Sequence, residues 1–504
     1  MKEKIDIKNK YLTLFLLCCG TLLHAHAYAA DAAPKPTYKR APVGTFQSVM
    51  DDTLLGNNYE KPIWNLHDAL NLPDWLALGV DHRTRYEGMD GSFRSTNRGD
   101  QQINFQTSAW LQATINNFRF ATEFMDSRAM DSDVNNQLST DTADFVQAYV
   151  SWADKDAFNT KLGMEFKVGR QTLDLGSRRF IARPYYRNTV NSFTGLKFRI
   201  LDNSNWQFQT FTMFPVSRVP AVLTAQNNDK HRFDEEDFNT WFSGGIFEFN
   251  RLPMGITGEA YLYYFDEAAE TTDNVRTRNR QYYTPGVRFY IKPKKGQFDF
   301  QAEGMGQFGT ARYNAALSTN QNHEAWSSHV ELGYTFEVPW SPRVFAEYDY
   351  ASGNKNPSKN NSEDTRFDWL FGSPVPDFGH TGLYGAFTRS NINSPGYKIN
   401  FTPRSDTVIN FQHRFVWLAS SSDCWGGAAC IPPTTMLKPS KNSGSYVGDQ
   451  IGINLRHDFN SSLTFDSGWY HLFKGEFAKN GVSTAGKVSP EDIDFFYIQS
   501  QFRF

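Results

Sequence analysis

The residues with the clearest chemical potential form an arginine-rich stretch from Gly169 to Asn188. The stretch holds one acid, Asp174, against five arginines: Arg170, Arg178, Arg179, Arg183 and Arg187. Guanidinium groups bind carboxylates and phosphates through two parallel hydrogen bonds, and they stay charged at any physiological pH. The stretch therefore indicates a site that binds an anion.

The histidines show no spacing typical of a catalytic or metal site. Three lie in or near expected loops without an obvious partner motif: His231, His323 and His380. Three others fall on the apolar side of an alternating pattern: His413, His457 and His471. A hydrolase needs a Ser/His or Asp/His cluster, and a zinc site needs closely spaced His, Cys or carboxylate ligands. We therefore expect neither an enzyme nor a metal or other cofactor.

Beyond the N-terminal region the chain has one pair of cysteines, Cys424 and Cys430. They enclose the short sequence Trp-Gly-Gly-Ala-Ala. Two close cysteines in an exported chain predict a local disulfide. Closing so small a loop stabilises it by roughly 2 kcal/mol in the chain-entropy treatment.

The N-terminus has the pattern of a secretory signal peptide over residues 1–29. Four lysines lie within the first ten residues, an apolar stretch covers residues 11–23, and Ala27-Tyr28-Ala29 supplies a small-x-small cleavage site. The apolar stretch is too short for a membrane anchor helix, and no later run is long enough to span a membrane as a helix. Removal of residues 1–29 takes the formal charge from −3 to −5, which argues against a nucleic-acid partner.

From residue 75 onward the dominant period of the sequence is two. Aromatic residues make up 15% of the chain although its mean hydropathy is −0.55, as expected where apolar and polar residues alternate. From Lys161 to Val168, for example, apolar residues at even positions alternate with charged or small ones at odd positions. A strand places alternate side chains on opposite faces. About eighteen such strands are predicted, each with one apolar and one polar face.

The connections between these strands are short and long in strict alternation. Tight turns such as 202–204 alternate with long links such as 170–192 and 353–393. This is the layout of a bacterial outer-membrane barrel with short periplasmic turns and long external loops. A β-propeller or a stacked sandwich also repeats short strands, but neither requires charged residues throughout the second face. We predict an all-β fold: a transmembrane antiparallel up-and-down barrel over residues 75–504, preceded by a periplasmic segment over residues 30–74.

The final strand ends on the aromatic Phe504, which is typical of the signal read by the barrel-assembly machinery of exported bacterial β-proteins. We expect that machinery, outer-membrane lipid and lipopolysaccharide as partners of a monomeric barrel.

Eighteen strands enclose a lumen wide enough for water, so the charged face must line it. Twelve cations and twelve acids fall on that face, and among the cations Arg83, Arg85 and Arg119 join the arginine-rich stretch as candidate anion-binding residues. The stretch either folds into the lumen as an electropositive constriction or forms an external loop that binds lipopolysaccharide phosphates. The 353–393 link is too long for a simple hairpin, and we expect it to cover the mouth as a lid.

A series of short motifs resembles the alginate-export family of outer-membrane channels. They run in consistent order over most of the mature chain: Leu72-Pro-Asp-Trp-Leu76, Arg83-Thr-Arg-Tyr-Glu87, Asp126-Ser-Arg128, Gln147-Ala-Tyr-Val150, Gly169-Arg-Gln171, Gly176-Ser-Arg-Arg179, Asn191-Ser-Phe-Thr-Gly195, Tyr348-Asp-Tyr-Ala-Ser-Gly-Asn354 and Phe367-Asp-Trp-Leu-Phe371. Each motif alone is weak. The resemblance implies an eighteen-stranded monomeric barrel, lined with arginine and lysine, that passes an acidic uronate polymer. It also makes Arg170 the best candidate for a cation at the constriction.

Three functions stay open on these grounds. The leading hypothesis is a passive channel for anionic solutes or an acidic, alginate-like polysaccharide. A general or cation-accepting uptake porin agrees with the balanced charges of the wall. A barrel enzyme such as a lipase or protease is the third, and it lacks a catalytic motif.

Overall fold

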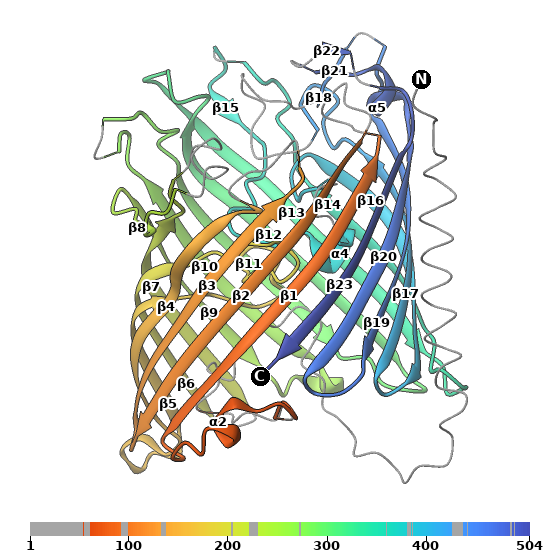
Figure 1. The fold of residues 1–504 in the computed structure, drawn as a ribbon. Helices are drawn as coiled ribbons and strands as arrows, with labels where there is room; N and C mark the ends of the chain where they lie inside the picture. Colours follow the sequence, from red (N-terminus) through yellow and green to blue (C-terminus); the bar gives the residue numbers. More distant parts are fainter. Residues whose placement is uncertain are drawn as a thin grey trace.

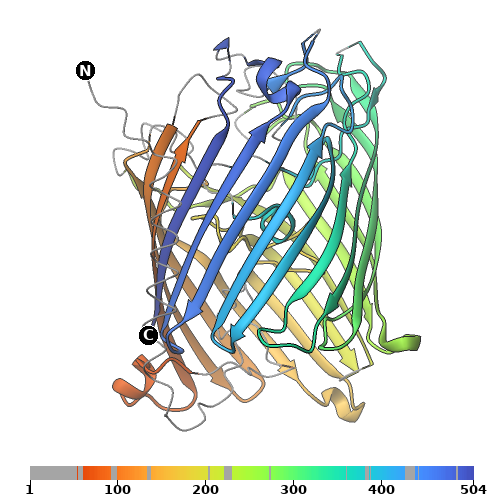
Figure 2. The same cartoon turned by 90° about the vertical axis from the view of Figure 1, so that its right-hand side faces the viewer.

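The computed structural model describes residue 54 and residues 61–504, apart from residues 92–98, 133–137, 203–204, 221–229, 272–273, 359, 381–384, 386, 426–436, 441, 484–485 and 488. Eighteen long strands follow one another around a barrel (Figures 1 and 2). The first nine are β1 (Leu76–Asp90), β2 (Gly99–Ile115), β3 (Phe118–Met130), β4 (Asp141–Asp154), β5 (Gly163–Gln171), β6 (Phe193–Asp202), β7 (Trp206–Ser217), β9 (Thr240–Phe249) and β10 (Thr257–Glu267). The others are β11 (Gln281–Ile291), β12 (Phe298–Arg312), β13 (Asn320–Thr335), β14 (Arg343–Ala351), β16 (Ile392–Arg404), β17 (Thr407–Trp417), β19 (Tyr446–Asp458), β20 (Leu463–Lys474) and β23 (Ile493–Arg503).

Short elements lie in the connections between these strands. The helices are α2 (Leu66–Ala69), α4 (Val375–Phe378), α5 (Glu476–Asn480) and the 3₁₀ turns Ala157–Asn159 and Pro253–Gly255. The two-residue strands are β8 (Glu235–Glu236), β15 (Glu363–Asp364), β18 (Leu437–Lys438), β21 (Val482–Ser483) and β22 (Gly486–Lys487). Among the described residues no helix has the length and apolar character needed to cross a membrane.

The barrel is closed by antiparallel pairing of its first and last strands. Tyr86 of β1 lies opposite Ile498 of β23, and β1 pairs with β2 along its other edge. Every strand of the wall is antiparallel to both neighbours. Closure leaves no unpaired strand edge, which a sheet in lipid requires because lipid cannot hydrogen-bond the backbone. The predicted barrel of about eighteen strands is confirmed.

The wall is apolar outside and polar inside. On β3, Phe118 and Phe120 are 50% and 48% exposed on the outer surface, whereas Arg119 between them is 9% exposed. On β1, Arg83 and Arg85 are buried toward the interior. This arrangement, the reverse of a soluble protein, suits an outer face in contact with lipid.

Short turns gather at one end of the barrel and long connections at the other (Figure 1). In the two-residue turn between β2 and β3, Asn116 adopts a left-handed φ of 53°, which asparagine tolerates better than most residues. The C-terminus lies at the short-turn end, which is the periplasmic end in this class of barrel. The predicted alternation of turn lengths holds for most connections, but the external connection 313–319 is no longer than the periplasmic turn 336–342, because β12 and β13 extend further than the sequence predicted.

The described part of the N-terminal segment packs against the periplasmic rim. The ring of Trp64 stacks on Phe502 and Phe504 at centroid distances of 6.3 and 5.9 Å, and the Trp64 amide donates to Ser462 Oγ. The signal peptide over residues 1–29 lies outside the described residues and stays a prediction. Cys424 is fully buried, but Cys430 lies outside the described residues, so their disulfide also stays a prediction.

Candidate functional site

Two long external connections fold inward and fill part of the lumen. We call residues 172–192, between β5 and β6, the arginine segment, and residues 352–391, between β14 and β16, the second segment. They pair directly, because Ala182 N donates to Phe371 O and Ser373 N donates to Arg178 O, both at 3.0 Å. The second segment carries α4 into the barrel interior (Figures 1 and 2). The segment that we predicted to cover the mouth as a lid therefore reaches down into the lumen, and its role as a lid stays a prediction.

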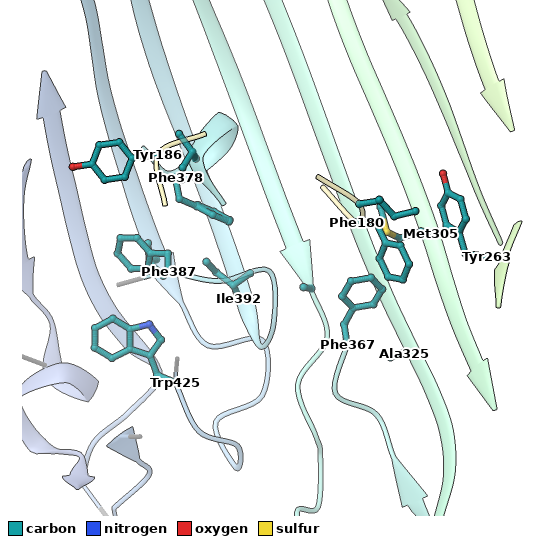
Figure 3. Close-up of a cluster of buried hydrophobic side chains, with 14 of the residues drawn as sticks. Phe180, Tyr186, Tyr263, Met305, Ala325, Phe367, Phe378, Phe387, Ile392 and Trp425 are labelled. Carbon is teal, nitrogen blue, oxygen red and sulfur yellow. The ribbon is translucent and has the colours of Figure 1, made fainter. Parts of the chain in front are cut away.

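Aromatic packing supports this pairing inside the barrel. Phe180 of the arginine segment stacks on Tyr263 of β10 at 5.6 Å and contacts Phe367 of the second segment at 6.2 Å. Figure 3 shows these rings with Met305 of β12. The two segments thus have an apolar core of their own against the wall.

Arg179 is the central ion-pairing residue of the arginine segment. Its Nε and Nη2 donate to the two carboxylate oxygens of Asp377 at 3.0 and 2.8 Å, and its Nη1 donates to Glu303 of β12 at 2.8 Å. The guanidinium therefore joins the arginine segment to α4 and to the wall. Burial raises the pKa of Asp377, but Arg179 and Arg389 outweigh burial and hold that pKa below its usual range.

Two further arginines of the segment are paired with carboxylates. Arg183 forms a two-pronged pair with Glu123 of β3, at 2.6 and 2.8 Å. Arg178 pairs within the segment with Asp174 at 2.6 Å. Carboxylates of the protein itself therefore pair with these arginines of the segment.

The wall arginines of β1 hold the end of the arginine segment through its backbone. Arg83 donates to the carbonyl oxygens of Tyr185 and Arg187 and to Asn188 Oδ1. Arg85 donates to the Tyr186 carbonyl at 2.6 Å and, through Nε, to Glu87 at 2.6 Å. Both guanidiniums thus fix the path of residues 185–188 across the lumen.

The three remaining predicted arginines, Arg170, Arg119 and Arg187, contact other groups. Arg170, at the external end of β5, pairs with Asp144 at 3.0 Å and with Glu236 of β8 at 2.8 Å. Arg119 lies on β3 beside the periplasmic turn, buried to 9% exposure. Arg187 donates to Thr189 O and to Asn191 Oδ1, which also accepts from Arg218. The predicted site residues thus spread along the lumen, with Arg83, Arg85, Arg178, Arg179, Arg183 and Arg187 around the arginine segment.

A second group of charges shares Asp377 with Arg179, and the sequence predicted only some of its members. Arg389 of the second segment pairs with Asp349 at 2.7 Å and also with Asp377. Arg414 of β17 pairs with Glu347 at 3.1 Å and also with Asp349. Strand alternation places Glu347, Asp349 and Arg414 inside, but no local pattern marks Asp377 or Arg389.

This group also contains a possible metal-ligand set. His329, Asp349 and Asp377 are buried and bring ligand atoms within 4.8 Å of one another. His329 Nδ1 already contacts Asp349 Oδ1 at 2.9 Å, and Arg179, Arg389 and Arg414 donate to the two carboxylates. Three guanidiniums so close disfavour a bound cation, so we interpret this set as part of the ion-pair network.

His380 links the two segments to the wall through neutral hydrogen bonds. Its Nε2 lies 3.0 Å from the Tyr185 hydroxyl and its Nδ1 lies 3.1 Å from the Tyr470 hydroxyl. Burial, with the nearby cations Arg85, Lys398 and Arg456, lowers the pKa of His380 to about 3. The ring is therefore neutral at physiological pH.

A cavity of about 450 Å³ lies within the lumen near the periplasmic ends of β7 and β9–β13. Asp174 and Gly176 of the arginine segment form one side of it. The wall contributes polar side chains: Gln207, Gln209, Glu248, Glu259, Arg288, Tyr290, Lys292, Asp299, Gln301 and Glu331. The cavity is thus lined mainly by amides and paired charges.

A closed barrel with inward-folded external segments defines the class of outer-membrane channels. Within that class, the chain belongs to the alginate-export family, since the family model described as "Alginate export" matches residues 74–490. The resemblance seen in the motifs is confirmed. Family and fold support a channel in the outer membrane. No curated protein sequence matches the chain.

Solved structures of outer-membrane channels share the fold. OccD3 (OpdP) of Pseudomonas aeruginosa has a TM-score of 0.52 at 13% identity, covering 94% of this chain and 99% of its own. A BenF-like porin from Pseudomonas fluorescens Pf-5 has a TM-score of 0.53 at 9% identity, with 85% and 98% covered. OccK2 (OpdF) of Pseudomonas aeruginosa, solved in complex with glucuronate, has a TM-score of 0.51 at 9% identity, with 85% and 98% covered.

Proposed function

We propose that the protein is a passive channel for small polar solutes with weak charge preference. The proposal rests on one observation: hydrogen bonds hold the two inserted segments in place inside the lumen. Arg179 joins the arginine segment to α4 and to β12 through three of them. A path narrowed by buried ion pairs suits monomers better than a polymer chain.

Weak charge preference follows from the pairing of the arginines. At least five of the eight candidate anion-binding residues have a carboxylate partner: Arg85, Arg170, Arg178, Arg179 and Arg183. A paired guanidinium contributes little net field to a passing solute, since the carboxylate beside it cancels most of its charge at a distance.

The second candidate is the selective passage of anions such as uronates, either as monomers or as an alginate-like polymer. The observation in its favour is the region around Asn191, whose Oδ1 accepts from Arg187 at 2.5 Å and lies 3.5 Å from Arg218. Arg187 donates its hydrogen bonds to the neutral oxygens of Thr189 and Asn191, while Asp141 and Asp234 are the acids near the two guanidiniums. The family description names alginate, and OccK2 was solved with glucuronate; both are uronates.

Ion selectivity and permeation of the refolded mature protein test both candidates. We expect a reversal potential near zero in a salt gradient across a planar bilayer, and entry of monosaccharides but not of polyuronate into proteoliposomes. Strong anion preference that falls in Arg187→Gln and is kept in Arg187→Lys would instead establish the second candidate. Passage of polyuronate would refute the narrow-channel proposal.

A further inference from the structure

The cavity beside the arginine segment has the dimensions and chemistry of a small-molecule site. Its volume of about 450 Å³ falls within the range of about 300–1,000 Å³ found for ligand pockets. We propose that it is a subsite for an uncharged, hydroxyl-rich solute such as a sugar. The proposal rests on the proposed function, because it requires that solutes enter the lumen.

Most charges that line the cavity are already neutralised in place. Glu259 pairs with Arg288 at 3.0 Å, and Asp174 pairs with Arg178 at 2.6 Å. Asp299 and Glu331 share the single guanidinium of Arg343, which leaves one negative charge in excess. Such pairs impose no strong demand for a charged ligand, yet their remaining lone pairs still accept hydrogen bonds from hydroxyl groups.

The net charge of the cavity lining that remains after these pairs is slightly negative. Glu248 accepts from the Gln207 amide at 2.9 Å, which is a neutral donor. Lys292 lies exposed in the turn after β11, at the rim of the cavity. An anionic solute would therefore find a carboxylate with a neutral partner at the wall, which disfavours a uronate at this subsite relative to a neutral sugar.

Three glutamines line the cavity: Gln207, Gln209 and Gln301. Gln207 accepts from Arg199 and donates to Glu248, so Gln209 offers sugar hydroxyls the more complete donor and acceptor pair. Each amide can both donate and accept. Gln301 Oε1 accepts from Arg288 Nε at 2.6 Å, which orients its amide group. Arg288 in turn lies 4.2 Å from the centre of the Tyr290 ring, so the polar side chains on this wall are held in defined positions.

Gly176 keeps the opposite side of the cavity open. A Cβ atom at this position would lie 3.2 Å from Glu259 Oε2 and 3.3 Å from Ile246 Cδ1. The residue also has a φ of 54°, a left-handed conformation that favours glycine. A side chain here would be strained and would crowd the groups that line the cavity.

Block of ion current by a neutral sugar tests the subsite. Sucrose is titrated on both sides of a planar bilayer holding single channels of the wild type, Gln209→Leu and Glu248→Gln. Gln112→Leu is the matched control, because Gln112 faces the lumen from β2, away from the cavity. We expect saturable block in the wild type, a half-blocking concentration raised roughly fivefold in each cavity variant, and no change in the control.

Other outcomes would refute the subsite but leave the proposed channel function unaffected. Ion current without sugar reports the channel itself, so a conducting wild type that sucrose does not block refutes only the subsite. Equal block in wild type and both cavity variants places the sugar elsewhere. Stronger block by glucuronate than by sucrose, reduced by the same variants, refutes the assignment to an uncharged solute.

Discussion

Arg179→Gln should loosen the inserted segments while leaving the barrel folded. The substitution removes the bidentate bond to Asp377 and the bond to Glu303, and it leaves two buried carboxylates without this partner. Breaking a buried ion pair from one side costs about 3–5 kcal/mol. Because Arg389 still contacts Asp377, we take the lower value, which increases the population of displaced segments by at least ~100-fold.

The assay is single-channel recording of the refolded protein. Wild-type current should be steady, whereas Arg179→Gln should show frequent transitions to larger conductance. The matched control is Arg178→Gln, since Arg178 is the adjacent residue but pairs within its own segment with Asp174. Arg179→Lys should be intermediate, because an ammonium cannot form the two-pronged bond. Identical current traces for Arg179→Gln and the wild type would refute the idea that this ion pair fastens the segments.

Three further perturbations probe other contacts. The pKa of His380 is lowered in the folded protein to about 3. The stabilising contribution of the neutral ring is therefore complete above its unfolded pKa near 6.5 and is lost as pH falls toward 3. Current fluctuations should rise on acidification from pH 7 to 4, and His380→Gln should flatten that dependence. Replacing residues 375–389 by an equally long Gly/Ser linker removes α4 from the lumen, and single-channel conductance should increase; unchanged conductance would mean that α4 does not narrow the path. Trp64→Ala removes two ring contacts with Phe502 and Phe504, each worth about 0.5–1.5 kcal/mol. The variant should therefore unfold at a lower temperature than the wild type, as measured on a denaturing gel. Trp75→Ala, at a side chain that is 51% exposed, is the control variant.

The barrel could be predicted from the sequence because its determinants are local. A strand in lipid must alternate apolar and polar residues along its own length, so the alternation around Arg119 or Glu123 is visible without knowledge of any neighbour. The same rule placed Glu303, Asp349 and Arg414 inside the barrel. Turn lengths are also local, and their alternation gave the orientation of the wall.

The contacts of the inserted segments could not be predicted in the same way because the residues that form them are distant in the sequence. Arg179 and Asp377 are 198 residues apart, and Arg83 reaches the carbonyl of a residue 102 positions away. The prediction of a lid from the 353–393 link rested on its length, which says nothing about where α4 comes to lie. Only the folded wall brings these groups together.

The count of five arginines against one acid in residues 169–188 described that stretch alone. In the folded protein the stretch faces a wall, and the wall supplies the missing carboxylates: Glu123 for Arg183 and Glu303 for Arg179, with Asp377 coming from the second segment. An arginine-rich segment in a barrel can therefore be the complement of an acidic interior, with no surplus for a solute. The charge that selects a solute is the charge left after these internal pairs are subtracted. We propose Arg187 as the arginine of this stretch to test for that role, because its hydrogen bonds go to neutral oxygens of Thr189 and Asn191.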